Sequence, residues 1–310
     1  MASEILKTYG DTSIREDVNS FVELITALEA WFLNNLGKSQ AYGPVHQTQV
    51  DTLPAAASLA VQEGEDLTAT STLVPTLLPN IVQHVARTFH VSDVQRKVAH
   101  FNGEDMLAYQ TVKAGKEIGN ALEFDLIRSV LVSGVSGTTP KMKGIVQAIS
   151  KSTNTTVHSS GTVLSASIIN GLMKANWDNS NGTVATDVFM GSFNRNTVDG
   201  FTQKSNSLVQ FPATEILNTV DMYQTSFGRI AVHVHRRVYL SSSGGGIGAD
   251  STGRLLFVNP EYLKIAYLNP IYLIDLAKTG AADKKAFVTD LTVEVKNQDV
   301  HQNATGFDID

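Results

Sequence analysis

The sequence contains no cysteine and has no excess of basic side chains. The first absence excludes disulfides, thiol catalysis and thiolate metal sites. The formal net charge is -6, and residues 1–155 carry 12 basic against 16 acidic side chains, while residues 156–310 carry 12 against 14. Proteins that hold nucleic acid through its phosphates need clustered lysine and arginine. We therefore expect only weak contact with DNA.

Long apolar runs are also missing. No stretch of 18 apolar residues occurs, and the first ten residues lack a cationic patch followed by an apolar core. We therefore expect no membrane span and no secretory signal, and we expect the protein to be made and assembled in a cytoplasm.

Catalytic motifs are absent as well. The patterns G-x-x-x-x-G-K-[ST], G-x-S-x-G and H-E-x-x-H, which mark phosphate binding, serine hydrolysis and zinc proteolysis, do not occur. The run GGGIGA at residues 244–249 resembles a dinucleotide fingerprint, but a strand pattern follows it instead of the helix that such a site requires. We expect a loop there, and we assign no catalytic and no cofactor-binding residues.

The best candidates for metal ligands in the sequence are two histidines. His233 and His235 stand two apart on a predicted strand, so their imidazoles point to the same face. No third ligand is visible nearby, and the charges of Arg236 and Arg237 oppose a cation. We interpret the pair as a half-exposed strand face, and we predict no metal site.

The strongest regular element is a long helix over residues 104–132. Asn102 can cap it, with Asp105 three residues on. Its apolar face follows helical spacing and consists of Leu107, Thr111, Ala114, Ile118, Leu122, Leu126 and Val130. Its charges are mixed in sign and follow no heptad, so the pattern favours a spine packed on a sheet over a coiled coil.

Before the spine, the pattern indicates a projecting arm. Strands are predicted at residues 43–53 and 81–91, and the connection at 52–78 is rich in Ala, Thr, Ser and Leu with an acidic turn at 63–66. Connections inside a compact domain seldom exceed about 15 residues. We therefore expect a two-stranded arm that leaves the body and needs a partner surface, most simply a neighbouring copy.

The remaining elements predict an α+β protein. A polar stretch at residues 1–19 and a short helix at 21–36 come first. After the spine, helices are predicted at 165–177 and 193–201. Strands are predicted at 186–190, 215–223, 229–240, 255–258 and 291–295, with an apolar segment at 262–276.

Several phrases resemble a known family. They are VQEGED, HVSDVQRKVAHFNGEDMLAYQTVKAGKEIGNALEFDLI, KMKGI, TSFGRIAVHVHRRV and YLNPIYLIDLAKTG. Together with the order of the elements, they resemble tailed-bacteriophage major capsid proteins of the Hong Kong 97 fold. The resemblance covers nearly the whole chain and is strongest at residues 92–127 and 223–280.

This resemblance implies a division of the chain. It implies an N-terminal arm at 1–42, an extended E-loop at 43–91, a peripheral domain with the spine helix at 92–164, an axial domain at 165–280, and a C-terminal segment at 281–310 whose strand completes the peripheral domain.

The resemblance also implies a function. The chain would be a non-enzymatic major capsid protein of the virion, which self-assembles as hexamers and pentamers into an icosahedral shell around phage DNA. Separate scaffolding, portal and decoration proteins would be its other partners. The alternatives are an encapsulin-like nanocompartment shell protein of the same fold and, from another class, an α+β enzyme, against which the missing motifs argue.

One departure from some members of this fold concerns how the shell is locked. Those members join subunits by an isopeptide bond from an E-loop lysine to a neighbour's asparagine. Residues 43–91 contain no lysine, and their only basic side chain, Arg87, does not deprotonate to a nucleophile. We therefore expect residues 52–78 to stabilise the shell non-covalently by laying apolar side chains on the next subunit's spine.

Overall fold

The structure is a computed structural model that describes residues 30–51, 53, 57–64, 66, 74–98, 105–135, 137–180, 183–204, 221–238, 253–278 and 280–308. The predicted polar stretch at 1–19, most of the predicted helix at 21–36 and the glycine-rich loop lie outside these residues. The part of that helix that is described is α1 (Trp31–Asn35).

The predicted spine is α3 (Met106–Arg128), about 35 Å long for its 23 residues. Asp105 caps it, because its carboxylate accepts a hydrogen bond from the Leu107 amide at 3.1 Å. The predicted start was therefore two residues early, and the predicted cap Asn102 lies outside the described residues. The buried face carries the predicted positions Ala114, Ile118, Leu122 and Leu126.

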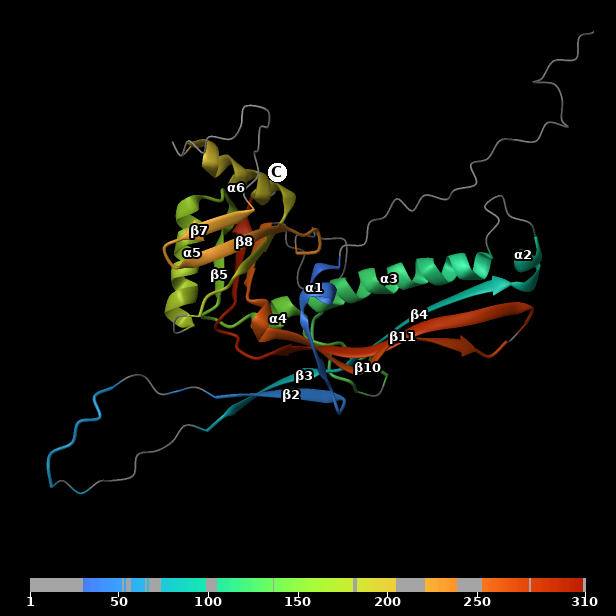
Figure 1. Cartoon of the computed structure of the whole chain (residues 1–310), viewed down its shortest axis with the longest axis horizontal. Coiled ribbons are helices and arrows are strands. Elements are labelled where there is room, and N and C mark those ends of the chain that lie inside the picture. Colours follow the sequence, from blue (N-terminus) through green and yellow to red (C-terminus); the bar gives the residue numbers. More distant parts are fainter. Residues whose placement is uncertain are drawn as a thin grey trace, which may run out of the picture.

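The spine runs along a four-stranded sheet (Figure 1). The strand order is β1 (Gly37–Gln40), β10 (Leu263–Leu276), β11 (Ala282–Val295) and β4 (Gln83–Ser92). The short helix α2 (Asp93–Lys97) follows β4 at the far end of the sheet (Figure 1). The predicted strand at 291–295 is the end of β11, which lies inside this sheet between β10 and β4.

A six-stranded sheet forms the other half of the body. Its order is β5 (Thr155–Thr162), β12 (Gln302–Phe307), β9 (Gly253–Val258), β6 (Asp187–Met190), β8 (Gly228–Val234) and β7 (Met222–Thr225). Helices α5 (Ala166–Asn179) and α6 (Ser192–Lys204) accompany it, as predicted, and α4 (Ile145–Ile149) lies beside the end of α3. A single 3-10 turn, η2 (Pro260–Tyr262), precedes β10.

Three strands belong to a different sheet from the one that the predicted division of the chain implies. The segment at 262–276 is β10 in the four-stranded sheet, although it falls within the predicted axial range. Conversely, β5 and β12 belong to the six-stranded sheet. The physical reason is that their partners are remote: β12 pairs in parallel with β5 and antiparallel with β9, and no local pattern encodes such pairings.

Strand β9, near the centre of the six-stranded sheet, is buried on both faces. Along β9, Leu255 and Phe257 join the core beneath α5 and α6, while Leu256 and Val258 face the core shared with α3 and the four-stranded sheet. This explains why β9 is an unbroken buried run instead of an alternating one. The shared core joins the two halves of the molecule.

Strand β12 contains a bulge at Gly306, where its register with β5 and β9 shifts. Gly306 has φ of +101°, and a Cβ atom there would lie 2.2 Å from the carbonyl oxygen of His158. Only glycine fits this close approach of two strands.

We expect Gly306→Ala to lower the free energy of unfolding by more than about 4 kcal/mol, since it adds a backbone clash to the cost of positive φ. The matched control is Gly137→Ala, at φ +84° with open space around it, which should cost only about 1–2 kcal/mol. Guanidinium unfolding measures both, and equal losses would contradict the assigned pairing of β12.

A buried histidine precedes the same strand. His301 is fully buried, and its Nδ1 accepts a hydrogen bond from the Asn259 amide at 3.3 Å. Burial lowers the pKa of His301 from 6.5 to about 3. Between these two pH values the unfolded chain binds a proton that the folded chain does not, so acid favours unfolding in that window.

We therefore expect His301 to reduce the free energy of unfolding by up to about 1.4 kcal/mol per pH unit as pH falls from 6.5 towards 3. His301→Gln should flatten this part of the stability curve, whereas His90→Gln, at an exposed strand position, should leave it unchanged. Urea unfolding at several pH values tests both variants, and parallel curves for wild type and His301→Gln would refute the assignment.

Candidate functional site

The described residues contain no group of three or more His, Asp or Glu side chains placed to hold a metal ion. No described helix is long and apolar enough to cross a membrane. Of the two histidines singled out by the sequence, His235 is not on a half-exposed face: it is buried, and its Nε2 lies 3.1 Å from Oε1 of Glu123. The expectation failed because its partner lies on α3, remote in sequence.

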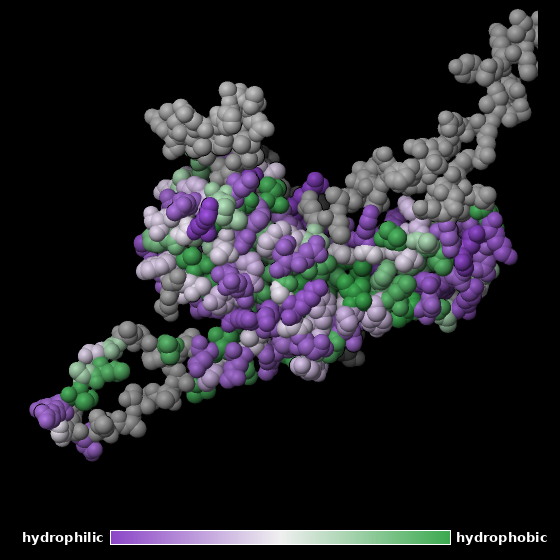
Figure 2. All heavy atoms as spheres, in the orientation of Figure 1, coloured by the Kyte–Doolittle hydropathy of each residue, from purple (hydrophilic) through white to green (hydrophobic). Residues whose placement is uncertain are grey.

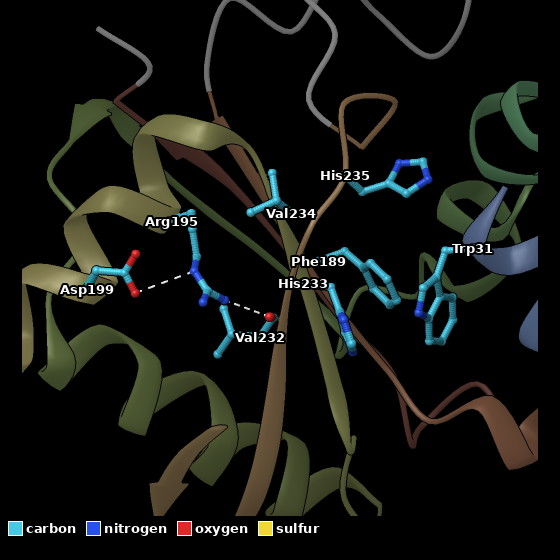
Figure 3. A pocket seen from close by; sticks show the side chains of 8 residues that line it. All are labelled: Trp31, Phe189, Arg195, Asp199, Val232, His233, Val234 and His235. Atoms are coloured by element: carbon cyan, nitrogen blue, oxygen red, sulfur yellow. Dashed lines mark hydrogen bonds and ion pairs between the residues drawn. The ribbon is translucent and has the colours of Figure 1, made fainter. Parts of the chain in front are cut away.

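His233 is partly exposed and lines a pocket of about 430 Å³ beside α6 and β8 (Figure 3). Its Nε2 lies 2.8 Å from Oδ1 of Asp187, and its ring stacks on Phe189 at 5.1 Å. The pocket's one arginine, Arg195, donates to the carbonyl of Val232 at 2.6 Å and pairs with Asp199 at 3.4 Å. The bond to Val232 secures α6 to β8, and the pair with Asp199 lies within α6 and holds the guanidinium in place, so we assign the pocket a structural role.

The feature that stands apart from the body is the arm. Strands β2 (Val45–Val50) and β3 (Thr76–Ile81) form an antiparallel hairpin from Val45↔Ile81 to Val50↔Thr76 (Figure 1). Its second strand was misassigned: most of the predicted strand at 81–91 is β4 in the four-stranded sheet, and β3 begins earlier, inside the segment 52–78 interpreted as a connection. The hairpin itself is confirmed.

Beyond the hairpin, the arm carries apolar side chains in water. Leu53, Leu59, Val61 and Val74 are 93%, 91%, 63% and 82% exposed. Figure 2 shows apolar residues along the arm and polar ones at its end. Glu63 and Gly64 form a turn there, with Gly64 at φ +84°. Grouped exposed apolar side chains of this kind mark an interaction surface.

The root of the arm is fixed by a buried amide, Asn80. Its Nδ2 donates to the carbonyls of Val293 (2.8 Å) and Lys143 (3.1 Å). Its Oδ1 accepts from the amides of Lys143 (2.8 Å) and Ile81 (2.9 Å). One side chain thus joins β3 to β11 and to the loop before α4, and so sets the direction in which the arm leaves.

A second buried amide, Gln83, lies three residues later, at the start of β4. Its Nε2 donates to Oδ2 of Asp125 on α3 at 2.7 Å, and its Oε1 accepts from the Met142 amide at 3.2 Å. Burial raises the pKa of Asp125 above its usual value, against the effect of this hydrogen bond. Sequence analysis missed both amides; the only signal was a polar residue inside each apolar strand pattern.

Comparison with known proteins relates this architecture to viral shells. The SU10 major capsid protein family matches residues 5–307. No curated protein matches the chain in sequence. Among solved structures, the capsid of Myoviridae phage XM1 aligns with a TM-score of 0.64 at 13% identity, covering 99% of this chain and 100% of that one.

Two further structures show the same fold. The capsid of a native GTA particle gives a TM-score of 0.65 at 10% identity, covering 97% of this chain and 98% of that one. The SrpI encapsulin complex of Synechococcus elongatus gives 0.60 at 10% identity, with 98% and 96% covered. At these identities the structures establish the Hong Kong 97-like fold only, which an encapsulin shares with phage capsids.

The family match distinguishes a phage capsid protein from an encapsulin and from an enzyme, because it spans almost the entire sequence and describes capsid subunits. Capsid subunits act by associating with copies of themselves, which accords with an arm whose apolar side chains find no cover in their own subunit. The chain belongs to the SU10 major capsid protein family, and it is a major capsid protein that forms the shell of a phage head.

Proposed function

We propose that this capsid protein closes an icosahedral shell of hexamers and pentamers in which the arm of each subunit lies on the spine helix of the next. The observation that carries the proposal is the exposure of Leu53, Leu59, Val61 and Val74 on an arm that extends from the body. Burying such side chains stabilises association by about 25 cal/mol per Å² of apolar surface.

Geometry supports a head-to-tail contact. The arm leaves one end of the molecule, while the start of α3, with α2 beside it, lies at the opposite end (Figure 1). A contact between two different surfaces of identical subunits produces rings when the rotation closes. Rings of six and of five copies are the closed forms that an icosahedral shell requires.

The parts of the chain take the following roles in this proposal. Residues 1–42 are the N-terminal arm, whose strand β1 adds to the edge of the four-stranded sheet, and residues 43–82 are the E-loop, which ends before β4 instead of at residue 91. The four-stranded sheet with α3 is the peripheral domain, and the six-stranded sheet with α5 and α6 is the axial domain. This division follows the two sheets, so β10 moves to the peripheral part, and β5 and β12 move to the axial part.

Packaged DNA would touch the shell weakly. The protein's net charge of -6 and the even spread of its charges provide no basic surface for tight phosphate binding. Weak contact leaves packaged DNA free to move out. Scaffolding, portal and decoration proteins would be separate chains that share this shell.

Non-covalent locking can be tested on mature particles. Because residues 43–91 contain no lysine, an E-loop lysine cannot form an isopeptide bond with a neighbour. When mature particles are boiled in denaturant, this protein should therefore run on a gel at the position of the single chain, without a ladder of covalent multimers. A ladder of covalent multimers would contradict this prediction.

The role of the arm can be tested by shortening it. Replacing residues 53–73 by a tight turn should leave a soluble subunit of unchanged fold that fails to build stable shells, because the apolar contact is lost. The control is Glu63→Gln with Asp66→Asn, which keeps the length of the arm and its apolar residues and should retain assembly. Sedimentation and electron microscopy measure the outcome, and normal shells from the shortened variant would refute the role of the arm.

A further inference from the structure

Glu123 is a fully buried acidic side chain in the C-terminal third of α3. Its Oε1 accepts a hydrogen bond from the Phe32 amide at 2.9 Å, and its Oε2 accepts one from the Leu33 amide at 2.9 Å. Oε1 also lies 3.1 Å from Nε2 of His235, just after β8. One carboxylate therefore joins the spine helix, α1 and the end of a strand of the six-stranded sheet.

For α1, this carboxylate replaces a helix cap. The N-cap position is Ala30, and no side chain caps the helix locally. The first amides of a helix have no partner within the helix, and a negative charge near them is favourable. Glu123 provides both the acceptor and the charge from 90 residues away, so α1 depends on α3 for its start.

The contact with His235 has a defined direction. The backbone amide of Arg237 donates to Nδ1 of His235 at 3.2 Å, so the ring proton lies on Nε2 and points to Glu123. The Arg237 guanidinium also donates to Oδ1 of Asn120 at 3.2 Å. Both contacts bind the segment after β8 to the same part of α3.

Residues 30–40, which we name the N-terminal strap, contact both halves of the molecule. The Trp31 and Phe32 rings lie 4.6 Å and 4.5 Å from Phe189 on β6, in the six-stranded sheet. A few residues later, β1 pairs in parallel with β10 of the four-stranded sheet, from Gly37↔Lys264 to Gln40↔Tyr267. The strap therefore fastens one sheet to the other, and Glu123 holds its start.

We propose that Glu123 is a positioning residue for shell assembly: it fixes the strap, and through the strap the angle between the two sheets. Stability alone does not require a buried carboxylate, because apolar side chains of similar volume often stabilise a core equally well. Three directed hydrogen-bond contacts supply what apolar packing lacks, a single arrangement of the elements they join.

The angle matters because a shell repeats it in every subunit. A subunit whose two halves can rotate fits a range of curvatures, so its assemblies include open and irregular particles beside closed ones. This role lies beyond that of the arm, which supplies association energy and not curvature.

The test compares Glu123→Gln with Asn176→Ala. Glutamine keeps the shape of Glu123 but turns one acceptor into an NH₂ group facing an amide donor. Asn176 is equally buried and makes three hydrogen bonds to backbone groups, of Ala185, Asp299 and Val300, away from the strap. Both variants should unfold at a lower temperature than the wild type.

Only Glu123→Gln should expose the strap and disturb assembly. We expect hydrogen exchange at the Phe32 and Leu33 amides to be at least about tenfold faster, as for a lost bond to a charged acceptor. Electron microscopy should show a broadened distribution of particle diameters, whereas Asn176→Ala should form particles of wild-type diameter. Wild-type diameters for Glu123→Gln would overturn the proposal.

A second variant keeps the test decisive if Glu123→Gln does not fold. Leu33→Pro removes one amide donor at a position in the first turn of α1, where proline is compatible with the helix. It should broaden the particle diameters in the same way. Its effect and that of Glu123→Gln should combine to less than their sum, because both break one contact. Normal particles from Leu33→Pro would also overturn the proposal.

Discussion

The apolar side chains of the arm cannot be buried in the subunit that carries them. The hairpin of β2 and β3 directs them away from both sheets, and Leu53, Leu59 and Val74 remain more than four-fifths exposed. A surface of this kind is satisfied only by another copy or another protein. The constraint accounts for a subunit with two well-packed cores that carries a long exposed extension: the body provides the stability of the subunit, and in the proposed shell the arm provides its association.

An extension is useful only if its direction is fixed. A flexible arm would lose conformational entropy on docking, at about 1–2 kcal/mol for each ordered residue, which would offset much of the apolar gain. The pairing of β2 with β3 orders part of the arm beforehand, and Asn80 and Gln83 bind its root to β11 and α3. Strand β11 is in turn paired on both sides, so the root is attached to the interior of the four-stranded sheet.

Sequence analysis predicted those features that rest on local patterns. Helical spacing identified α3 with its buried face and also α5, and a short strand pattern identified β6. It did not predict that β12 joins β5 and β9, because those partners are remote and the segment lacks an alternating pattern. It also misjudged His235 and missed Asn80, since a polar side chain in an apolar strand reveals its burial only when its partners are known. The arm was predicted as a unit, although its second strand was placed too late.

The buried polar groups lie where orientation matters most. Hydrophobic burial is non-directional, so it can hold α3 against both sheets without selecting a single angle between them. Asn80 and Gln83 at the root of the arm, and Glu123 at the strap, instead contact named backbone groups on separate elements. An unpaired amide or carboxylate in a core is costly, so any rotation that breaks these contacts is penalised steeply. In a closed shell this division is physically necessary: apolar contacts supply the association energy, while a few directed hydrogen bonds restrict each subunit to the shape that lets the shell close.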